Sequence, residues 1–135
     1  MSPLFWVTIA GAVVSCLVIL VLVGRRNERL IRRDWELLLT PRGEKVYGAN
    51  CVACHQATGK GLPPAFPPLA GAKLVTGPKQ GHIDMVLNGK PGTAMAPFGK
   101  QLSDTEIAAV ISYERNSWGN KSGIVQPAEV KARRK

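Results

Sequence analysis

The stretch Cys51-Val52-Ala53-Cys54-His55 decides the fold of this chain. It has the form C-x-x-C-H, the attachment pattern of a c-type haem. The two cysteines can form thioethers to both vinyl groups of one porphyrin, and the adjacent histidine then lies beneath the ring, where it can ligate the iron. The pattern predicts one covalently bound haem, held by Cys51 and Cys54, with His55 as the proximal ligand.

Two other uses of C-x-x-C remain as alternatives. A structural zinc site needs four Cys or His ligands, and outside the motif the chain offers only Cys16, in an apolar run, and His82. A thioredoxin-like dithiol needs a βαβ context, and no strand-like run of β-branched residues flanks the motif. A haem site is the stronger interpretation, because the chain offers no second ligand pair for zinc and no βαβ fold around a redox dithiol.

The chain is 135 residues long, with room for one globular domain of roughly 80 residues plus an anchor. A domain of that size buries a marginal core, so the haem would supply much of its apolar centre. We divide the sequence into a transmembrane anchor at 1–24, a basic helical stalk at 25–40, a haem domain at 41–119 and a basic tail at 120–135. The tail is polar and interrupted by proline, so we expect it to be disordered or to lie on a partner.

The anchor contains a run of 20 uncharged residues from Leu4 to Val23. At about 1.5 Å per residue, a helix of this length spans the roughly 30 Å hydrocarbon layer of a membrane. A cleaved signal peptide is the weaker alternative, because Met1-Ser2-Pro3 carries no basic residue. Val13-Val14-Ser15-Cys16 loosely resembles a lipoprotein cleavage site, but more apolar residues follow Cys16. We therefore expect one N-terminal transmembrane helix.

The rest of the chain predicts helices joined by loops rich in glycine and proline. Thr40-Pro41 supplies an N-cap followed by proline at the first helical position, so a helix is expected to begin there and to run into Cys51. Ser103-Asp104-Thr105-Glu106 forms a capping box that begins a last helix, which should end near Trp118-Gly119. Between these helices the sequence predicts an irregular loop at 56–78, a short helix at 83–87 and a second loop at 91–101.

Several stretches around the motif carry a family resemblance. They are Gly43, Tyr47 and Cys51 at four-residue spacing, Pro67-Pro68-Leu69-Ala70-Gly71, Pro91-Gly92-Thr93-Ala94-Met95 and Val110-Ile111-Ser112-Tyr113. With these features the chain from 41 to 118 resembles a class I cytochrome c. The resemblance implies an all-α fold, a small helical mono-haem domain with long loops, in which the first and last helices cross closely at Gly43. Added to the anchor, it predicts a class I cytochrome c fold plus one N-terminal transmembrane helix.

The resemblance also assigns roles near the haem. It implies that the carbonyl of Pro67 accepts the N–H of His55, which would fix the imidazole tautomer. It implies that the loop containing Thr93 delivers Met95 as the second axial ligand. Met95 is also favoured over the other methionines, because Met85 lies among apolar neighbours in a predicted helix. His82 is the alternative ligand, since a bis-histidine haem also saturates the iron, although a partly exposed position near a helix start suits it better.

The two axial positions of the haem iron determine whether the domain can act as an enzyme or only carries electrons. If protein side chains occupy both, no small-molecule substrate reaches the iron, so the domain would carry one electron and would not be an enzyme by itself. Methionine ligation and an apolar pocket both raise the reduction potential, which suits donation to an oxidase. Candidate pocket residues are Phe66, Leu69, Leu74, Phe98 and Leu102. A peroxidase is the distant alternative, because it needs an open iron position.

A narrower resemblance points to a respiratory complex. The stretch from Gly43 to Trp118, followed by Gly119-Asn120, is similar to the haem domain fused to subunit II of some bacterial haem–copper oxidases. This chain departs from them by lacking the copper domain, since no free cysteine pair with His and Met remains to build a dinuclear copper centre. We expect an electron-transfer subunit of such an oxidase; the alternative is a tethered shuttle between a quinol-oxidising complex and an oxidase. Only 16 residues separate Val23 from Thr40, and so short a stalk favours the subunit.

Charge and location follow from the same resemblance. Haem is attached to c-type proteins on the outer face of the energy-transducing membrane, so we expect the haem domain to face the periplasm from a bacterial inner membrane. The positive-inside rule argues the opposite, because five arginines follow the apolar run, which suggests that lipid headgroups or a companion subunit bind them. They are Arg25, Arg26, Arg29, Arg32 and Arg33.

The soluble part is also basic. From Pro41 onward, 13 Lys and Arg stand against 6 Asp and Glu, a net charge of +7. This excess suits docking to an acidic redox partner, although scattered lysines also occur on any solvated surface. Nucleic acid is not expected as a partner, because no recognised fold or aromatic-basic motif supports it. The lysines expected around the haem are Lys60, Lys73, Lys79, Lys90 and Lys100.

Overall fold

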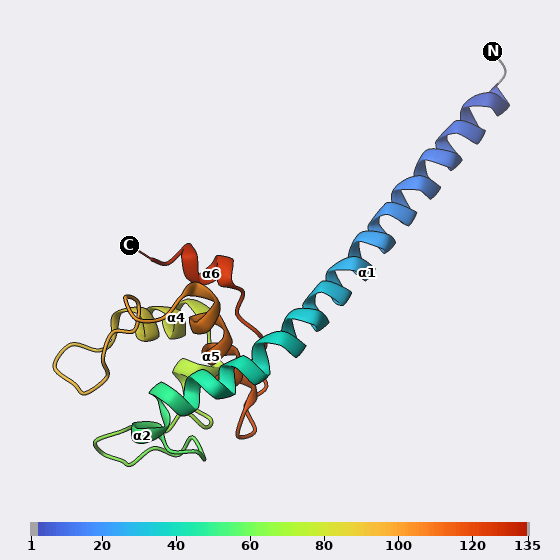
Figure 1. Ribbon diagram of the computed structural model, residues 1–135. Coiled ribbons are helices and arrows are strands. Elements are labelled where there is room, and N and C mark those ends of the chain that lie inside the picture. The colour runs from blue at the N-terminus through green and yellow to red at the C-terminus, as the bar shows by residue number, and fades with distance from the viewer. Residues whose placement is uncertain (1–2, 135) are drawn as a thin grey trace. The chain divides into compact units, whose positions relative to one another are not determined.

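The computed structural model describes the backbone of residues 3–134 and the side chains of residues 14–28 and 39–134. Over this range the chain is helical (Figure 1), and its one pairing of extended backbone is an isolated bridge between Leu62 and Phe66. The expected all-α class is confirmed for these residues. The helices are α1 Pro3–Asn50, α2 Val52–His55, α3 Lys73–Thr76, α4 Lys79–Asn88, α5 Asp104–Asn116 and α6 Pro127–Lys131.

The chain divides into two compact units, Met1–Trp35 and Glu36–Lys135. In the first unit, the apolar side chains described between Val14 and Val23 are all more than half exposed. Among the described residues, no helix carries an apolar stretch that is long enough to cross a membrane. The first half of the predicted span, Leu4 to Val13, lies outside the described side chains, as do Arg29, Arg32 and Arg33.

The helix α1 continues through Pro41, whereas the sequence predicted that a new helix begins at Thr40-Pro41. A proline inside a helix removes one backbone hydrogen bond and costs about 3 kcal/mol. Here Leu39 on one side of the proline and Val46 and Tyr47 on the other are all buried. Packing of both flanks into the second unit therefore keeps the chain helical across Pro41.

The core of the second unit forms where the last part of α1 crosses α5. A Cβ atom on Gly43 would lie 2.2 Å from the carbonyl oxygen of Ala109 and 2.6 Å from Cβ of Tyr113, so the crossing needs glycine. The predicted role of Gly43 is thus confirmed. Helices α4 and α6 complete the core with apolar side chains. Its main residues are Val46, Tyr47, Ile83, Val86, Leu87, Ile107, Val110, Ile111, Val125 and Val130.

The helix starts follow local sequence signals. At α5 the hydroxyl of Ser103 accepts from the N–H of Glu106, and the Glu106 carboxylate accepts from the N–H of Ser103, so the predicted capping box is confirmed. The helix α4 begins at Lys79, earlier than expected, and ends before Gly89, which has a φ of 66°. The loop predicted at 56–78 follows the short helix α2 and contains one short helix, α3, near its end.

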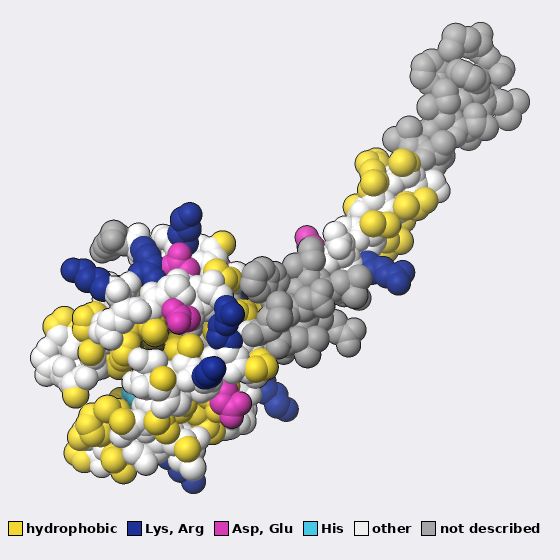
Figure 2. All heavy atoms as spheres, in the orientation of Figure 1, with side chains coloured by type: hydrophobic (Ala, Val, Ile, Leu, Met, Phe, Trp, Pro, Cys, Tyr) yellow, Lys and Arg dark blue, Asp and Glu magenta, His cyan; other side chains and the backbone are white. Residues whose placement is uncertain are grey.

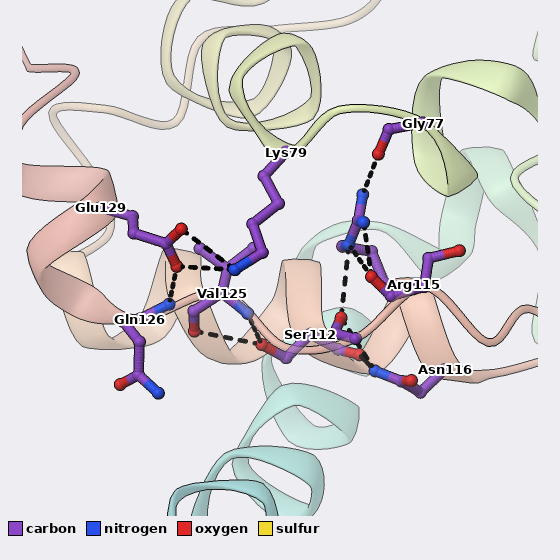
Figure 3. A network of polar contacts seen from close by, with 10 residues as sticks. Gly77, Lys79, Ser112, Arg115, Asn116, Val125, Gln126 and Glu129 are labelled. Carbon is purple, nitrogen blue, oxygen red and sulfur yellow. Dashed lines mark hydrogen bonds and ion pairs between the residues drawn. The ribbon is translucent and has the colours of Figure 1, made fainter. Parts of the chain in front are cut away.

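Residues 120–134, called the C-terminal segment below, were expected to be disordered or to lie on a partner, whereas in the structure they pack against the helices of the second unit. Ile124, Val125 and Val130 are buried in the core, and α6 has its own capping box between Gln126 and Glu129. The ammonium of Lys79 in α4 lies 3.0 Å from the carboxylate of Glu129 in α6, and the N–H of Val125 donates to the hydroxyl of Ser112 in α5 (Figure 3). Three apolar side chains in an otherwise polar stretch were too weak a signal to predict this packing.

Candidate haem site

The motif Cys51–His55 is placed at the end of the first helix by a tight turn. The N–H of Cys51 donates to the carbonyl of Tyr47 at 2.9 Å, and α2 follows at Val52–His55. Gln56 then adopts a φ of 62°, which ends the helix. Cys51, Cys54 and His55 are all half-buried, and both cysteines are free thiols. The two thiols and the imidazole therefore lie on one short turn.

The imidazole of His55 is oriented by a backbone carbonyl. Its Nδ1 atom lies 3.0 Å from the oxygen of Pro67, so the hydrogen bond expected from the resemblance is present. Gly61 makes this contact possible, because it has a φ of 62° and a Cβ there would lie 2.3 Å from the oxygen of Phe66. Because Nδ1 carries the proton and donates it, Nε2 of His55 keeps a free lone pair that can bind a metal.

Met95 lies on the loop between α4 and α5, residues 89–103, called the methionine loop below. The N–H of Lys90 donates to the carbonyl of Met95 at 3.0 Å. Thr93 stabilises this turn, because its hydroxyl donates to the carbonyl of Lys90 at 2.8 Å and accepts from the N–H of Met95 at 3.3 Å. A Cβ on Gly89 would lie 2.5 Å from the Met95 oxygen, so glycine is required there too. The structure places Met95 half-buried in a tightly bonded turn.

Three aromatic rings support the other side of the motif. The ring of Tyr47 lies in a tilted arrangement against Tyr113 and Trp118, at 5.4 Å and 5.1 Å between ring centroids. The hydroxyl of Tyr47 donates to the carbonyl of Gln56 at 2.7 Å, and the indole N–H of Trp118 donates to that of Ala57 at 2.9 Å. These bonds tie the end of the motif to α1 and to the residues after α5. The sequence indicated the aromatic residues but not these carbonyl partners.

A buried carboxylate, Glu114 of α5, stands close to the motif and was missed by the sequence analysis. Its Oε2 atom lies 2.8 Å from Nε2 of His82, and both side chains are buried. The expectation that His82 is partly exposed was therefore wrong, because this partner draws it into the core. Burial, together with the neighbouring Glu114, raises the pKa of the Cys51 thiol to about 12. The thiol is therefore neutral at ordinary pH.

The residues present fit a covalently attached haem. The free thiols, the lone pair of His55 and the thioether of Met95 form the donor set of such a group. Around them, Leu69, Phe98 and Leu102 are only partly buried against the core, and Leu74 is 41% exposed, so apolar surface is available to a porphyrin. Among the described side chains, no three of His, Cys, Asp or Glu come together as metal ligands, so the second ligand pair that zinc requires is not assembled there.

Basic side chains surround the apolar ones on the second unit. Figure 2 shows Lys and Arg side chains spread over the visible face, with apolar side chains between them. Lys60, Lys73, Lys90 and Lys100 are exposed, whereas Lys79 is half-buried and paired with Glu129. Four of the five lysines expected on this surface are therefore free to meet solvent or a partner.

The sequence of this chain is also similar to known proteins. Residues 39–113 match the family described as cytochrome C oxidase, cbb3-type, subunit III. The chain is 39% identical over 96 aligned positions to cytochrome c-552 of Thermus thermophilus, an alignment that spans 61% of this chain and 72% of the relative.

Two further relatives are parts of larger assemblies by their names. The chain is 34% identical over 99 positions to the cytochrome c subunit of a quinone alcohol dehydrogenase from Gluconacetobacter polyoxogenes, which covers 65% of this chain and 21% of the relative. It is 36% identical over 87 positions to the cbb3-type cytochrome c oxidase subunit CcoP of an Azospirillum species, which covers 59% of this chain and 29% of the relative. The likeness to these two therefore concerns one domain of longer proteins.

Proposed function

This chain belongs to the family of cytochrome c oxidase, cbb3-type, subunit III, and from that premise we propose that it is the membrane-anchored electron-transfer subunit of a respiratory complex, a haem–copper cytochrome c oxidase. Membership of the family gives the chain one covalent haem c and an electron-transfer role, and the chain is an electron carrier without catalysis of its own. The anchor, the complex and the residues of the site are the proposed part.

The bond between His55 and Pro67 carries the assignment of the site. The haem supplies a one-electron iron couple, and the residues of this chain hold and tune it. Cys51 and Cys54 form the thioethers, while His55 and Met95 ligate the iron. Pro67 makes His55 a better donor by accepting its N–H, and Thr93 fixes the turn that presents Met95.

The membrane anchor is proposed at residues 1–24. It would hold the protein in a bacterial inner membrane, with the haem domain on the periplasmic side. It is supported by the uncharged run Leu4–Val23 and by the exposed apolar side chains described from Val14 onward, because a helix with a fully apolar surface suits lipid. Protease added to spheroplasts should remove the haem domain. Protection there, with cleavage only in inverted vesicles, would contradict this topology.

The partner is proposed to be acidic around its electron entry or exit site. The exposed lysines Lys60, Lys73, Lys90 and Lys100 support this, since complementary charge speeds encounter and is screened by salt. The test is purification from gently solubilised membranes, followed by identification of the subunits that accompany the cytochrome. Oxidase subunits at equal stoichiometry are expected. Recovery of the cytochrome alone, with respiration unchanged by a lengthened stalk, would favour the shuttle instead.

A further inference from the structure

The methionine loop is fastened to α4 just after Met95. The N–H of Phe98 donates to the carbonyl of Val86, and that of Gly99 donates to the carbonyl of Leu87, both at 3.0 Å. A Cβ on Gly99 would lie 2.9 Å from the Leu87 oxygen, which shows how closely the two backbones approach. The position of Met95 therefore depends on how firmly the residues from 98 to 103 are held.

Arg134, in the C-terminal segment, binds this part of the loop from the other side. Its guanidinium donates to the carbonyl of Gly99 and, at 2.7 Å, to the carbonyl of Leu102. Its Nε atom lies 2.5 Å from the carboxylate of Asp104, the first residue of α5. The side chain of Arg134 thus links two backbone carbonyls of the methionine loop to the first residue of α5.

We infer that Arg134 is a positioning residue for the methionine loop, which it holds in the conformation that keeps Met95 on the iron. The inference rests on the proposed ligation by Met95. An iron–thioether bond in a long loop competes with the conformational freedom of that loop, so contacts that order the loop lower the fraction of molecules in which the methionine has left the iron. The family match ends at residue 113, so Arg134 lies outside the part of the chain that the family shares.

The planar fork of arginine matters for this role. Charge-assisted hydrogen bonds are stronger than neutral ones, and a guanidinium can reach two carbonyls and a carboxylate at once, whereas a lysine ammonium acts as a point charge. The side chains of Arg134 and Asp104 are 30% and 28% exposed, so solvent screens their interaction only in part.

The neighbouring residue provides a matched control. Arg133 pairs with Asp84 of α4 in the same C-terminal segment, and their side chains are 43% and 37% exposed. The hydrogen bonds between these two side chains fasten the segment to α4 and not to the methionine loop. Loss of Arg133 should therefore weaken docking of the segment but leave the ligand loop in place.

The test measures how readily added imidazole displaces Met95 in the oxidised, haem-loaded full-length protein. Apparent affinity for imidazole scales with the fraction of molecules whose sixth position is open. Arg134→Ala should bind imidazole about tenfold more tightly than the wild type, which corresponds to about 1.4 kcal/mol. Arg134→Lys should fall between the two, and Arg133→Ala should stay within about twofold of the wild type. Far-ultraviolet circular dichroism would verify that all variants are folded under the conditions used.

Equal imidazole affinity in Arg134→Ala and Arg133→Ala would overturn the inference, as would tightening in Arg134→Ala that appears only where helix content is also lost. Failure of the underlying ligation looks different. In that case Met95→Ala would leave the near-infrared sulfur-to-iron band and the imidazole affinity unchanged, whatever residue stands at 134.

Discussion

His82 and Glu114 form a hydrogen bond of 2.8 Å between Nε2 and Oε2, with both side chains buried. It joins α4 to α5 close to the attachment motif, because Glu114 is near enough to raise the pKa of both Cys51 and Tyr47. Within the described residues, Nδ1 of His82 is buried without a hydrogen-bond partner. A proton on Nε2, donated to the carboxylate, fits this arrangement, since a bare lone pair is easier to bury than an N–H without an acceptor.

Removal of His82 should destabilise the protein more than neutralisation of Glu114. His82→Leu leaves a buried carboxylate without its donor, and we expect a loss of about 3 kcal/mol in the free energy of unfolding. Glu114→Gln keeps an acceptor oxygen toward His82, so its loss should be about 1 kcal/mol. Urea unfolding of the reduced haem protein measures both values. A larger loss in Glu114→Gln would show that its charge stabilises the protein through another contact.

Gly43 and Gly48 offer a matched pair on one helix. Gly43→Ala brings a Cβ to 2.2 Å from the Ala109 oxygen, so α1 and α5 must separate, and we expect a loss of about 3 kcal/mol or more. At Gly48 a Cβ would meet nothing within 4 Å, so Gly48→Ala should stabilise the helix by about 0.5 kcal/mol. Thermal unfolding followed by circular dichroism compares the two. Equal behaviour would mean that the helices do not cross as described.

Stability at alkaline pH should depend on Tyr47. Burial, reinforced by the nearby Glu114, raises the pKa of its phenol above the ordinary value of about 10. Above that pH the unfolded chain releases a proton that the folded protein retains, so stability is full below pH 10 and falls as the pH rises, by up to about 1.4 kcal/mol per pH unit. Urea unfolding of the reduced protein at pH 8 and pH 11 should show a smaller alkaline loss in Tyr47→Phe than in the wild type. An equal loss in both would assign the effect to other groups.

The identity of the axial ligand can be read from one absorption band. The oxidised wild type should show the weak near-infrared sulfur-to-iron band of a His/Met haem, and Met95→Ala should abolish it while the haem stays covalently bound. Met85, half-buried in α4, is the control, and Met85→Ala should keep the band. The reverse result would exchange the roles of the two methionines.

Local signals predicted the parts of this structure that a few neighbouring residues determine. The capping box at Ser103 and Glu106 follows from a four-residue pattern, whereas the close approach at Gly43 followed from the family resemblance, and both are present. The hydrogen bond from His55 to Pro67 followed from the resemblance of a five-residue stretch. In each case either the partners lie close together in sequence or a known fold supplies the missing partner.

Contacts between distant residues escaped the sequence analysis. Glu114 bonds to His82, which is 32 positions away, and Arg134 bonds to Gly99 and Leu102 across more than 30 positions. No spacing rule relates such residues, so nothing in the sequence paired His82 with Glu114, and His82 was expected to be partly exposed. The continuation of α1 through Pro41 escaped for a related reason, because tertiary packing outweighed a strong local signal for a helix start.

The bonds of Arg115 bear on how the protein is made. Its guanidinium donates to the carbonyls of Val75 and Gly77 on one side and to those of Ser122 and Gly123 on the other. Ser122 and Gly123 belong to the C-terminal segment, so this arginine closes the last-synthesised part of the chain onto the rest of the domain, far along the sequence from the attachment motif. A stop codon after Gly119 would keep both cysteines and Trp118 and would remove the final closure. Such a gene defect would impair the folding of the matured protein and spare its haem attachment.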